Sequence, residues 1–203
     1  MVLAKLLIKP GMRVVESGTG TGSLSVSFAR MLIPSGRLFT FEFNQDRAEK
    51  AVEDFQQLRL SETITVTHRD VIENGFLLES EVQENSIDAV FLDLPAPVKA
   101  VTHAQKVLKS KGRICNFSPC IEQVQGATMQ LAREGFYDIR TFECLSRELN
   151  VTKKHFISLE NASNSDSKTN QEEESKEEPG NGKLLGKRMH ETVKMPVASP
   201  KVL

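Results

Sequence analysis

The chain has 203 residues, enough for one α/β domain with a sizeable core but too few for two full ones. Its formal charge of -1 at pH 7 excludes a whole-chain attraction to nucleic acid or acidic membranes, so any RNA affinity must be local or come from a partner. The three cysteines show no C-x-x-C spacing, which argues against a zinc site and suits a reduced intracellular compartment.

Apolar runs and amphipathic segments alternate along the first part of the chain, which predicts βαβ units and a mostly parallel sheet. We expect strands at Arg13 to Ser17, Arg37 to Phe43, Ile64 to Arg69, Ser86 to Asp93, Arg113 to Phe117 and Tyr137 to Leu145. We expect helices at Met1 to Ile8 (the last turns of a longer helix), Ser23 to Leu32, Gln45 to Leu58, Val98 to Leu108 and Pro119 to Ala132. The predicted fold is a doubly wound, Rossmann-like α/β domain.

A glycine loop follows the first predicted strand in the stretch Glu16-Ser-Gly-Thr-Gly-Thr-Gly22. Dinucleotide-binding loops need G-x-G-x-x-G, but the third position of that motif is Ser23 here. The pattern instead resembles the first motif of class I S-adenosylmethionine-dependent methyltransferases, with Glu42 as the acid at the tip of the next strand. An ordinary strand-to-helix turn is the alternative for the loop alone, and Glu42 disfavours it.

Acidic residues end the predicted strands at Glu16, Glu42, Asp70 and Asp93. The carboxyl ends of parallel strands share one edge of a sheet, and ligands bind outside that edge, so we expect the four acids to lie together. Asp93 precedes two prolines, so a structural role as a turn residue is its alternative. Arg47, in the first turn of the second predicted helix, suits either a carboxylate partner near the loop or plain solvation.

Three further segments of the sequence carry structural predictions. Ser118-Pro119 predicts a helix start, with Ser118 as the N-cap and the first turn at the same sheet edge. Ser146 to Glu160 suggests a ragged strand or hairpin arm. From Asn161 the composition changes to Asn, Ser, Lys and Glu, which predicts a disordered polar tail over 161–203 after a domain over 1–160.

Several motifs together closely resemble the catalytic subunit of the eukaryotic tRNA (adenine-58-N1)-methyltransferase, a class I methyltransferase. They are the glycine loop, Phe41-Glu-Phe43, Phe91-Leu-Asp-Leu-Pro-Ala-Pro97 and Phe117-Ser-Pro-Cys-Ile-Glu-Gln-Val124. The resemblance implies S-adenosylmethionine as cofactor and tRNA as substrate. It also implies a related non-catalytic subunit as partner, a dimer of such pairs, and a location chiefly in the nucleus.

The resemblance assigns roles residue by residue and implies no metal. The cofactor-binding residues it implies are Glu16, Gly18, Gly20, Thr21, Gly22, Ser23, Leu24, Glu42, Arg47, Asp70, Val71 and Asp93. The substrate-binding residues it implies are Leu92, Asp93, Leu94, Pro95, Phe117, Ser118, Pro119, Cys120, Ile121, Glu122, Gln123 and Val124. Asp93 would be the catalytic residue. Its carboxylate suits an adenine ring nitrogen, which needs no strong base but gains positive charge as it is methylated.

The sequence departs from the family's pattern in three ways. Val98 stands where the family usually has Trp, the family's small N-terminal β domain does not precede Met1, and nothing in the tail predicts the family's C-terminal closing strand. We therefore expect the last predicted strand to have an exposed edge. Two alternatives stay open: an inactive truncated isoform or non-catalytic oligomerising subunit, and a small-molecule methyltransferase, for which the near-neutral charge would be natural.

Overall fold

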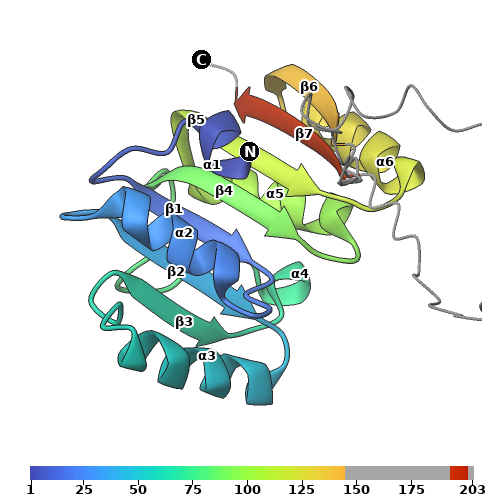
Figure 1. Cartoon of the computed structure of the whole chain (residues 1–203). Coiled ribbons are helices and arrows are strands. Elements are labelled where there is room, and N and C mark those ends of the chain that lie inside the picture. Colours follow the sequence, from blue (N-terminus) through green and yellow to red (C-terminus); the bar gives the residue numbers. More distant parts are fainter. Residues whose placement is uncertain (145–192, 201–203) are drawn as a thin grey trace, which may run out of the picture. The chain divides into compact units, whose positions relative to one another are not determined.

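A seven-stranded sheet forms the centre of the fold, with the order β3-β2-β1-β4-β5-β7-β6 (Figure 1). The computed structural model describes residues 1–144 and 193–200, all of which belong to one compact unit. The strands are β1 (Arg13–Ser17), β2 (Arg37–Glu42), β3 (Ile64–His68), β4 (Ile87–Asp93), β5 (Leu108–Phe117), β6 (Phe136–Cys144) and β7 (Val193–Pro200). The helices are α1 (Val2–Leu6), α2 (Ser23–Leu32), α3 (Gln45–Gln57), α4 (Val71–Asn74), α5 (Pro97–Val107) and α6 (Ile121–Arg133).

Helices cover both faces of the sheet because consecutive apolar strand residues point to opposite sides. Val14 packs with residues of α1, α2 and α3 in one buried cluster. Its neighbour Val15 packs with residues of α4, α5 and α6 in the other. The predicted doubly wound α/β architecture is therefore confirmed.

The chain reverses its direction across the sheet beside β1. β1 pairs in parallel with β2 on one side and with β4 on the other, so the crossovers to these strands leave in opposite directions. Such a switch point opens a crevice at the carboxyl ends of the central strands, where ligands of open α/β sheets bind. Ser17 and Asp93, the last residues of β1 and β4, both line the cleft found there.

The C-terminal segment corrects one prediction. Residues Val193–Pro200 form β7, antiparallel to both β5 and β6, so the expectation that the tail holds no closing strand is wrong. The prediction of a disordered tail over 161–203 is wrong for these residues, and its remainder lies outside the described residues. The ladder to β6 runs from Phe136↔Pro200 to Cys144↔Val193, which gives β6 a partner along its length. The predicted hairpin arm over 146–160 is also outside the described residues.

Smaller differences concern the ends of elements. β5 begins at Leu108 rather than Arg113, and Lys109 within it pairs with Asp88 at 2.7 Å. α6 begins at Ile121 with Cys120 at the N-cap position, and Ser118 is buried instead of capping it. None of the described helices is long and apolar enough to cross a membrane.

Candidate active site

The glycine loop joins β1 to α2 in a backbone conformation that only glycine adopts readily. Gly18, Gly20 and Gly22 have φ angles of 92°, 55° and 72°, in the left-handed region. The N–H of Gly18 donates to the Phe41 carbonyl at 2.9 Å, which fixes the start of the loop against the end of β2. The loop therefore has a defined shape, and it turns directly into the N-terminus of α2 at Ser23.

The surroundings of the three glycines differ. A β-carbon on Gly18 would collide with the backbone carbonyl of Asp93, and one on Gly22 would lie 2.8 Å from the Phe55 ring. A β-carbon on Gly20 would meet nothing within 4 Å. Gly18 and Gly22 thus allow close packing inside the protein, whereas Gly20 faces open space in the cleft.

Glu42 closes the other side of the loop. Its Oε2 accepts a hydrogen bond from the Gly20 N–H and its Oε1 accepts one from the Asn44 N–H, each at 3.1 Å. The side chain is only 5% exposed, yet it lines the cleft. Glu42 therefore links the loop to the start of α3 and also presents a carboxylate to a ligand.

Glu16 lies beneath the loop, outside the main cleft. It is 1% exposed, it accepts a hydrogen bond from the Ser25 hydroxyl at 2.5 Å, and it lines a smaller cavity of about 320 Å³ behind the glycines. Burial raises its pKa to about 7, against the lowering effect of hydrogen bonds from Ser25 and Thr40, and the nearby Asp93 raises it further. Glu16 is thus a buried, titratable support of the loop.

Asp70 and Val71 lie at the end of β3, on the side of the cleft away from β4. The Asp70 Oδ1 accepts hydrogen bonds from the N–H groups of Ile72 at 2.9 Å and Glu73 at 3.4 Å, so this carboxylate caps the short helix α4. Both Asp70 and Val71 line the cleft, as predicted. The α4 helix itself was not predicted, because a four-residue helix shows too little periodicity to detect.

Asp93 ends β4 beside Gly18 and lines both the main cleft and the smaller cavity. Its side chain is exposed, while the surrounding atoms remove part of its solvation and raise the pKa of its carboxyl group above the usual value. The predicted meeting of the four acids is confirmed in this form: Glu42, Asp70 and Asp93 line one cleft of about 740 Å³, and Glu16 lies directly behind it.

The two predicted substrate-side segments are joined by side-chain hydrogen bonds. Gln123 in α6 donates from Nε2 to the Pro95 carbonyl at 3.1 Å. The Asn116 carboxamide faces the Leu92 carbonyl at 3.2 Å and the Ser118 hydroxyl at 2.9 Å. These contacts hold the chain on both sides of Asp93 against the β5–α6 connection.

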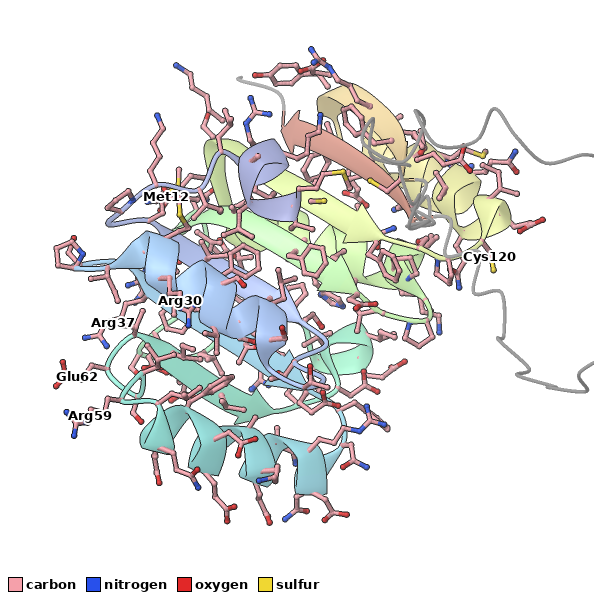
Figure 2. The ribbon with its side chains drawn as sticks, viewed as in Figure 1. Met12, Arg30, Arg37, Arg59, Glu62 and Cys120 are labelled. Carbon is pink, nitrogen blue, oxygen red and sulfur yellow. The ribbon has the colours of Figure 1, made fainter. Side chains whose placement is uncertain are left out.

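The members of this predicted set differ in exposure. Leu92, Ser118 and Val124 are buried, so they support the surface and do not themselves face a substrate. The exposed members are Pro95, Pro119, Cys120, Ile121 and Glu122, and the intermediate ones are Leu94, Phe117 and Gln123. Cys120, labelled in Figure 2, lies at the start of α6.

Some residues of the cleft were not predicted as site residues. Phe43, which is 70% exposed, directly follows the Glu42 strand tip, and Arg69 lies next to Asp70. The others are Ser17, Phe41, Asn44 and Ile72. The sequence signal that could have identified them is that they lie next to the predicted acids along the chain. Arg47 also lines the cleft, with its N–H bonded to the Asn44 side chain at 3.0 Å, and its side chain is exposed.

The residues fit S-adenosylmethionine. The cleft volume is within the range of small-molecule sites, and an apolar surface at Phe43 and Ile72 adjoins the carboxylates. The N-terminal turn of α2, at Ser23 and Leu24, offers free N–H groups beside the loop. Within residues 1–144 and 193–200, no cluster of His, Cys, Asp and Glu is arranged to hold a metal ion.

Fold and site together define a class I methyltransferase domain. A SAM-dependent O-methyltransferase from Thermotoga maritima superposes with a TM-score of 0.73 at 23% identity, over 100% of this chain and 64% of the other. The tRNA (m1A58) methyltransferase TrmI from Aquifex aeolicus gives 0.69 at 18% identity, over 99% of this chain and 67% of the other. At these identities the likeness shows the fold.

The chain belongs to the family described as the tRNA methyltransferase complex GCD14 subunit. The model of this family matches residues 1–199. It is 45% identical over 158 residues to the tRNA (adenine(58)-N(1))-methyltransferase catalytic subunit of Dictyostelium discoideum, covering 78% of this chain and 50% of that protein. The corresponding subunit of Candida albicans is 39% identical over 163 residues, covering 79% and 48%. The chain thus spans about half the length of these relatives.

Proposed function

We propose that the chain binds S-adenosylmethionine in the cleft and methylates N1 of adenosine 58 in tRNA. The observation that carries this proposal is the position of Asp93. Its carboxylate lies at the open end of β4, between the glycine loop and the Leu94-Pro95 segment that Gln123 holds. The names of the relatives supply the substrate, and the geometry of this chain supports the chemistry.

The chemistry requires orientation and charge stabilisation more than a strong base. S-adenosylmethionine, when bound, supplies an electrophilic methyl group. Adenine N1 has a free lone pair, so the Asp93 carboxylate needs only to accept a hydrogen bond from the neighbouring N6 amino group. That contact aligns N1 and stabilises the positive charge that the ring gains as the N–C bond forms.

The fold favours an active subunit over a degenerate one. All four acids keep their places around the cleft, and β7 provides the strand that the sequence did not predict. We infer that the chain works within a complex, as the family description indicates. The specific arrangement we propose is a pairing with a related non-catalytic subunit, two such pairs forming the assembly, chiefly in the nucleus.

The cofactor half of this proposal is tested by calorimetric titration of the chain with S-adenosylmethionine. We expect saturable binding that the substitution Glu42→Ala weakens by at least tenfold, because the change removes the carboxylate and frees the Gly20 N–H. Glu53→Ala, at an exposed site on α3, is the control and should bind normally. Absence of saturable binding by the unmodified chain would contradict the cofactor assignment.

The transfer step is tested with labelled cofactor and a tRNA transcript, in the presence of the co-expressed partner subunit. Asp93→Asn should lower the rate by about 10²–10³-fold, the usual cost of removing one charge-stabilising group, with cofactor affinity retained. Asp138→Asn, at an exposed residue of β6, is the matched control. The proposed substrate would be refuted if a transcript with guanosine at position 58 still incorporated label. It would also be refuted if label appeared only in small molecules.

A further inference from the structure

Three exposed arginines lie toward the end of the sheet opposite the cleft, with Arg37 and Arg59 at its outer edge and Arg30 farther in along α2 (Figure 2). Arg30 is in the last turn of α2, Arg37 is the first residue of β2, and Arg59 follows the end of α3. Helices of a parallel α/β fold run back against the strands, so their C-terminal ends reach the edge where the strands begin. We call these residues the amino-edge arginines.

The amino-edge arginines have no partners for their charge among the described residues. No hydrogen bond or ion pair involves their side chains within residues 1–144 and 193–200, whereas Lys50, Lys109 and Arg140 each pair with an aspartate at 2.7–2.9 Å. Glu62, which lies between Arg37 and Arg59 in the view of Figure 2, forms no ion pair with them. The charge of this edge is therefore available to an external anion.

The strand register places like charges together there. Arg13 of β1 is the register partner of Arg37 in the parallel β1–β2 ladder, so two neighbouring strands both begin with arginine. The Arg13 guanidinium lies over the Phe39 ring at 4.9 Å and donates to the Glu81 carbonyl, while the Asp88 carboxylate accepts from the Arg13 backbone N–H at 2.8 Å and pairs with Lys109. Among the described residues, the side chain of Arg37 has no such acidic neighbour in an ion pair.

The helix dipole explains only part of the arrangement. A cation in the last turn of a helix, such as Arg30, is favourable by itself. Arg59 follows the C-terminus of α3, where its N–H and that of Leu60 donate to the Gln56 and Phe55 carbonyls, so its left-handed φ of 57° belongs to a Schellman-type helix end. The helix ends thus account for the backbone positions of Arg30 and Arg59, whereas Arg37 belongs to a strand and has no helix dipole to complement.

We propose that the amino-edge arginines contact backbone phosphates of the RNA substrate, at a surface separate from the cleft; this inference rests on the proposed function. Guanidinium groups match the geometry of phosphate oxygens and stay charged at all relevant pH values. The cleft itself is lined by three acids, Glu42, Asp70 and Asp93, and by two arginines, Arg47 and Arg69, so its lining offers phosphates no net positive charge. RNA affinity then has to come from another part of the surface, because the chain as a whole is nearly neutral.

An RNA molecule that contacts both sites has to extend around the domain over at least the length of β2. The six residues of β2 separate the two edges by about 20 Å at roughly 3.3 Å per residue. Some domains contact a single RNA helix over about 16 base pairs, a longer distance than this. The surface would thus orient the RNA while its target base reaches Asp93.

The test measures binding of a tRNA transcript to the full chain by fluorescence anisotropy across a range of salt concentrations. The variant replaces Arg30, Arg37 and Arg59 together with Gln, and the control replaces Lys106, Arg133 and Arg140 with Gln, which removes the same charge elsewhere. The logarithm of the association constant falls linearly with the logarithm of the salt concentration, and each lost phosphate contact makes this slope less steep by roughly 0.7–0.9. The slope of the variant should therefore be less steep by about 2. We expect roughly tenfold weaker binding at moderate salt, with the control unchanged.

Two further measurements separate this surface from the active site. Calorimetry should give the same affinity for S-adenosylmethionine in the variant and in the unmodified chain, and Glu62→Gln should strengthen tRNA binding. Equal slopes for variant and control, or no measurable binding of tRNA by the unmodified chain, would overturn the inference. Loss of partner-subunit binding in place of tRNA binding would also overturn it, by showing that the edge meets an acidic protein surface. None of these outcomes decides the proposed methylation of adenosine 58, which is tested separately by the labelled-cofactor assay of the complex.

Discussion

Gly18 and Asp93 lie so close together that a β-carbon on Gly18 would collide with the backbone carbonyl oxygen of Asp93. This contact joins the cofactor loop to the strand end that carries the proposed catalytic carboxylate. Because Gly18 directly follows β1 and Asp93 ends the neighbouring parallel strand β4, a shift of either one moves the other. The position of the methyl-acceptor site therefore depends on Gly18, although Gly18 itself need not contact the methyl acceptor.

The substitution Gly18→Ala should be far more harmful than Gly20→Ala. The first forces a left-handed φ of 92° on alanine and a clash with Asp93, which we expect to cost about 3 kcal/mol or more of unfolding free energy. The second places a methyl group in open space at a φ of 55°, with an expected cost of about 1–2 kcal/mol. Urea unfolding followed by circular dichroism gives both values. Equal losses in the two variants would show that the contact with Asp93 is unimportant.

Glu16 should make the stability of the chain depend on pH. Its pKa is about 7 in the folded protein against 4.5 in the unfolded chain, so between these values the folded state binds more protons. Stability therefore falls as pH rises from 4.5 to about 7 and then levels off, with a total near 3 kcal/mol at 1.36 kcal/mol per pH unit.

The variant Glu16→Gln isolates this contribution, because an amide keeps an acceptor for the Ser25 hydroxyl and does not ionise. Relative to the unmodified chain, it should gain about 3 kcal/mol in unfolding free energy between pH 4.5 and pH 8. Urea titrations at these two pH values measure the gain, and Glu53→Gln on the surface of α3 is the control. A constant difference between variant and unmodified chain at both pH values would mean that Glu16 does not titrate near neutrality.

Gln123 should act as a positioning residue for the acceptor side. Replacement by Leu removes the hydrogen bond to the Pro95 carbonyl and loosens the segment that follows Asp93. We expect kcat of the assembled complex to fall roughly tenfold with S-adenosylmethionine affinity unchanged, because small errors of orientation are costly. Gln125→Leu, at an exposed site on the same helix, should leave kcat as it is. A parallel loss of cofactor affinity in Gln123→Leu would point to a general structural defect instead.

Sequence reasoning located the site because its main residues share a chemical pattern that follows the backbone. Acids at the tips of β1 to β4 had to meet at one edge once the sheet was parallel, and the structure confirms it. Phe43 and Arg69 could not be assigned in the same way. Their place in the cleft depends on how the chain turns after each strand, which composition and period do not specify.

Proline was involved in two of the predictions that the structure corrects, the start of α6 and the absence of a closing strand. Ser118-Pro119 predicted a helix start, but the Ser118 hydroxyl lies against Asn116 and the helix begins two residues later at Ile121. Pro196 and Pro200 cannot donate to a ladder, so local sequence rules do not favour a central strand in this segment. β7 nevertheless forms, since its pairs with β5 involve only Val197 and Ala198, and both prolines pair on the β6 side. Local rules missed a strand that long-range pairing stabilises.

β7 should be essential to the stability of the domain, and Val197 is the position that tests it. Val197 is paired with Cys115 of β5 and with Arg140 of β6, so Val197→Pro removes a backbone N–H at a strand position that has a neighbouring strand on each side. We expect a loss of about 3 kcal/mol or more, or aggregation through the exposed edge of β5. A chain that ends at Pro200 keeps the whole of β7 and should match the unmodified chain. Denaturant unfolding and size-exclusion chromatography measure the two effects. If Val197→Pro unfolds at the same urea concentration as the unmodified chain and stays monodisperse, β7 contributes nothing to the fold.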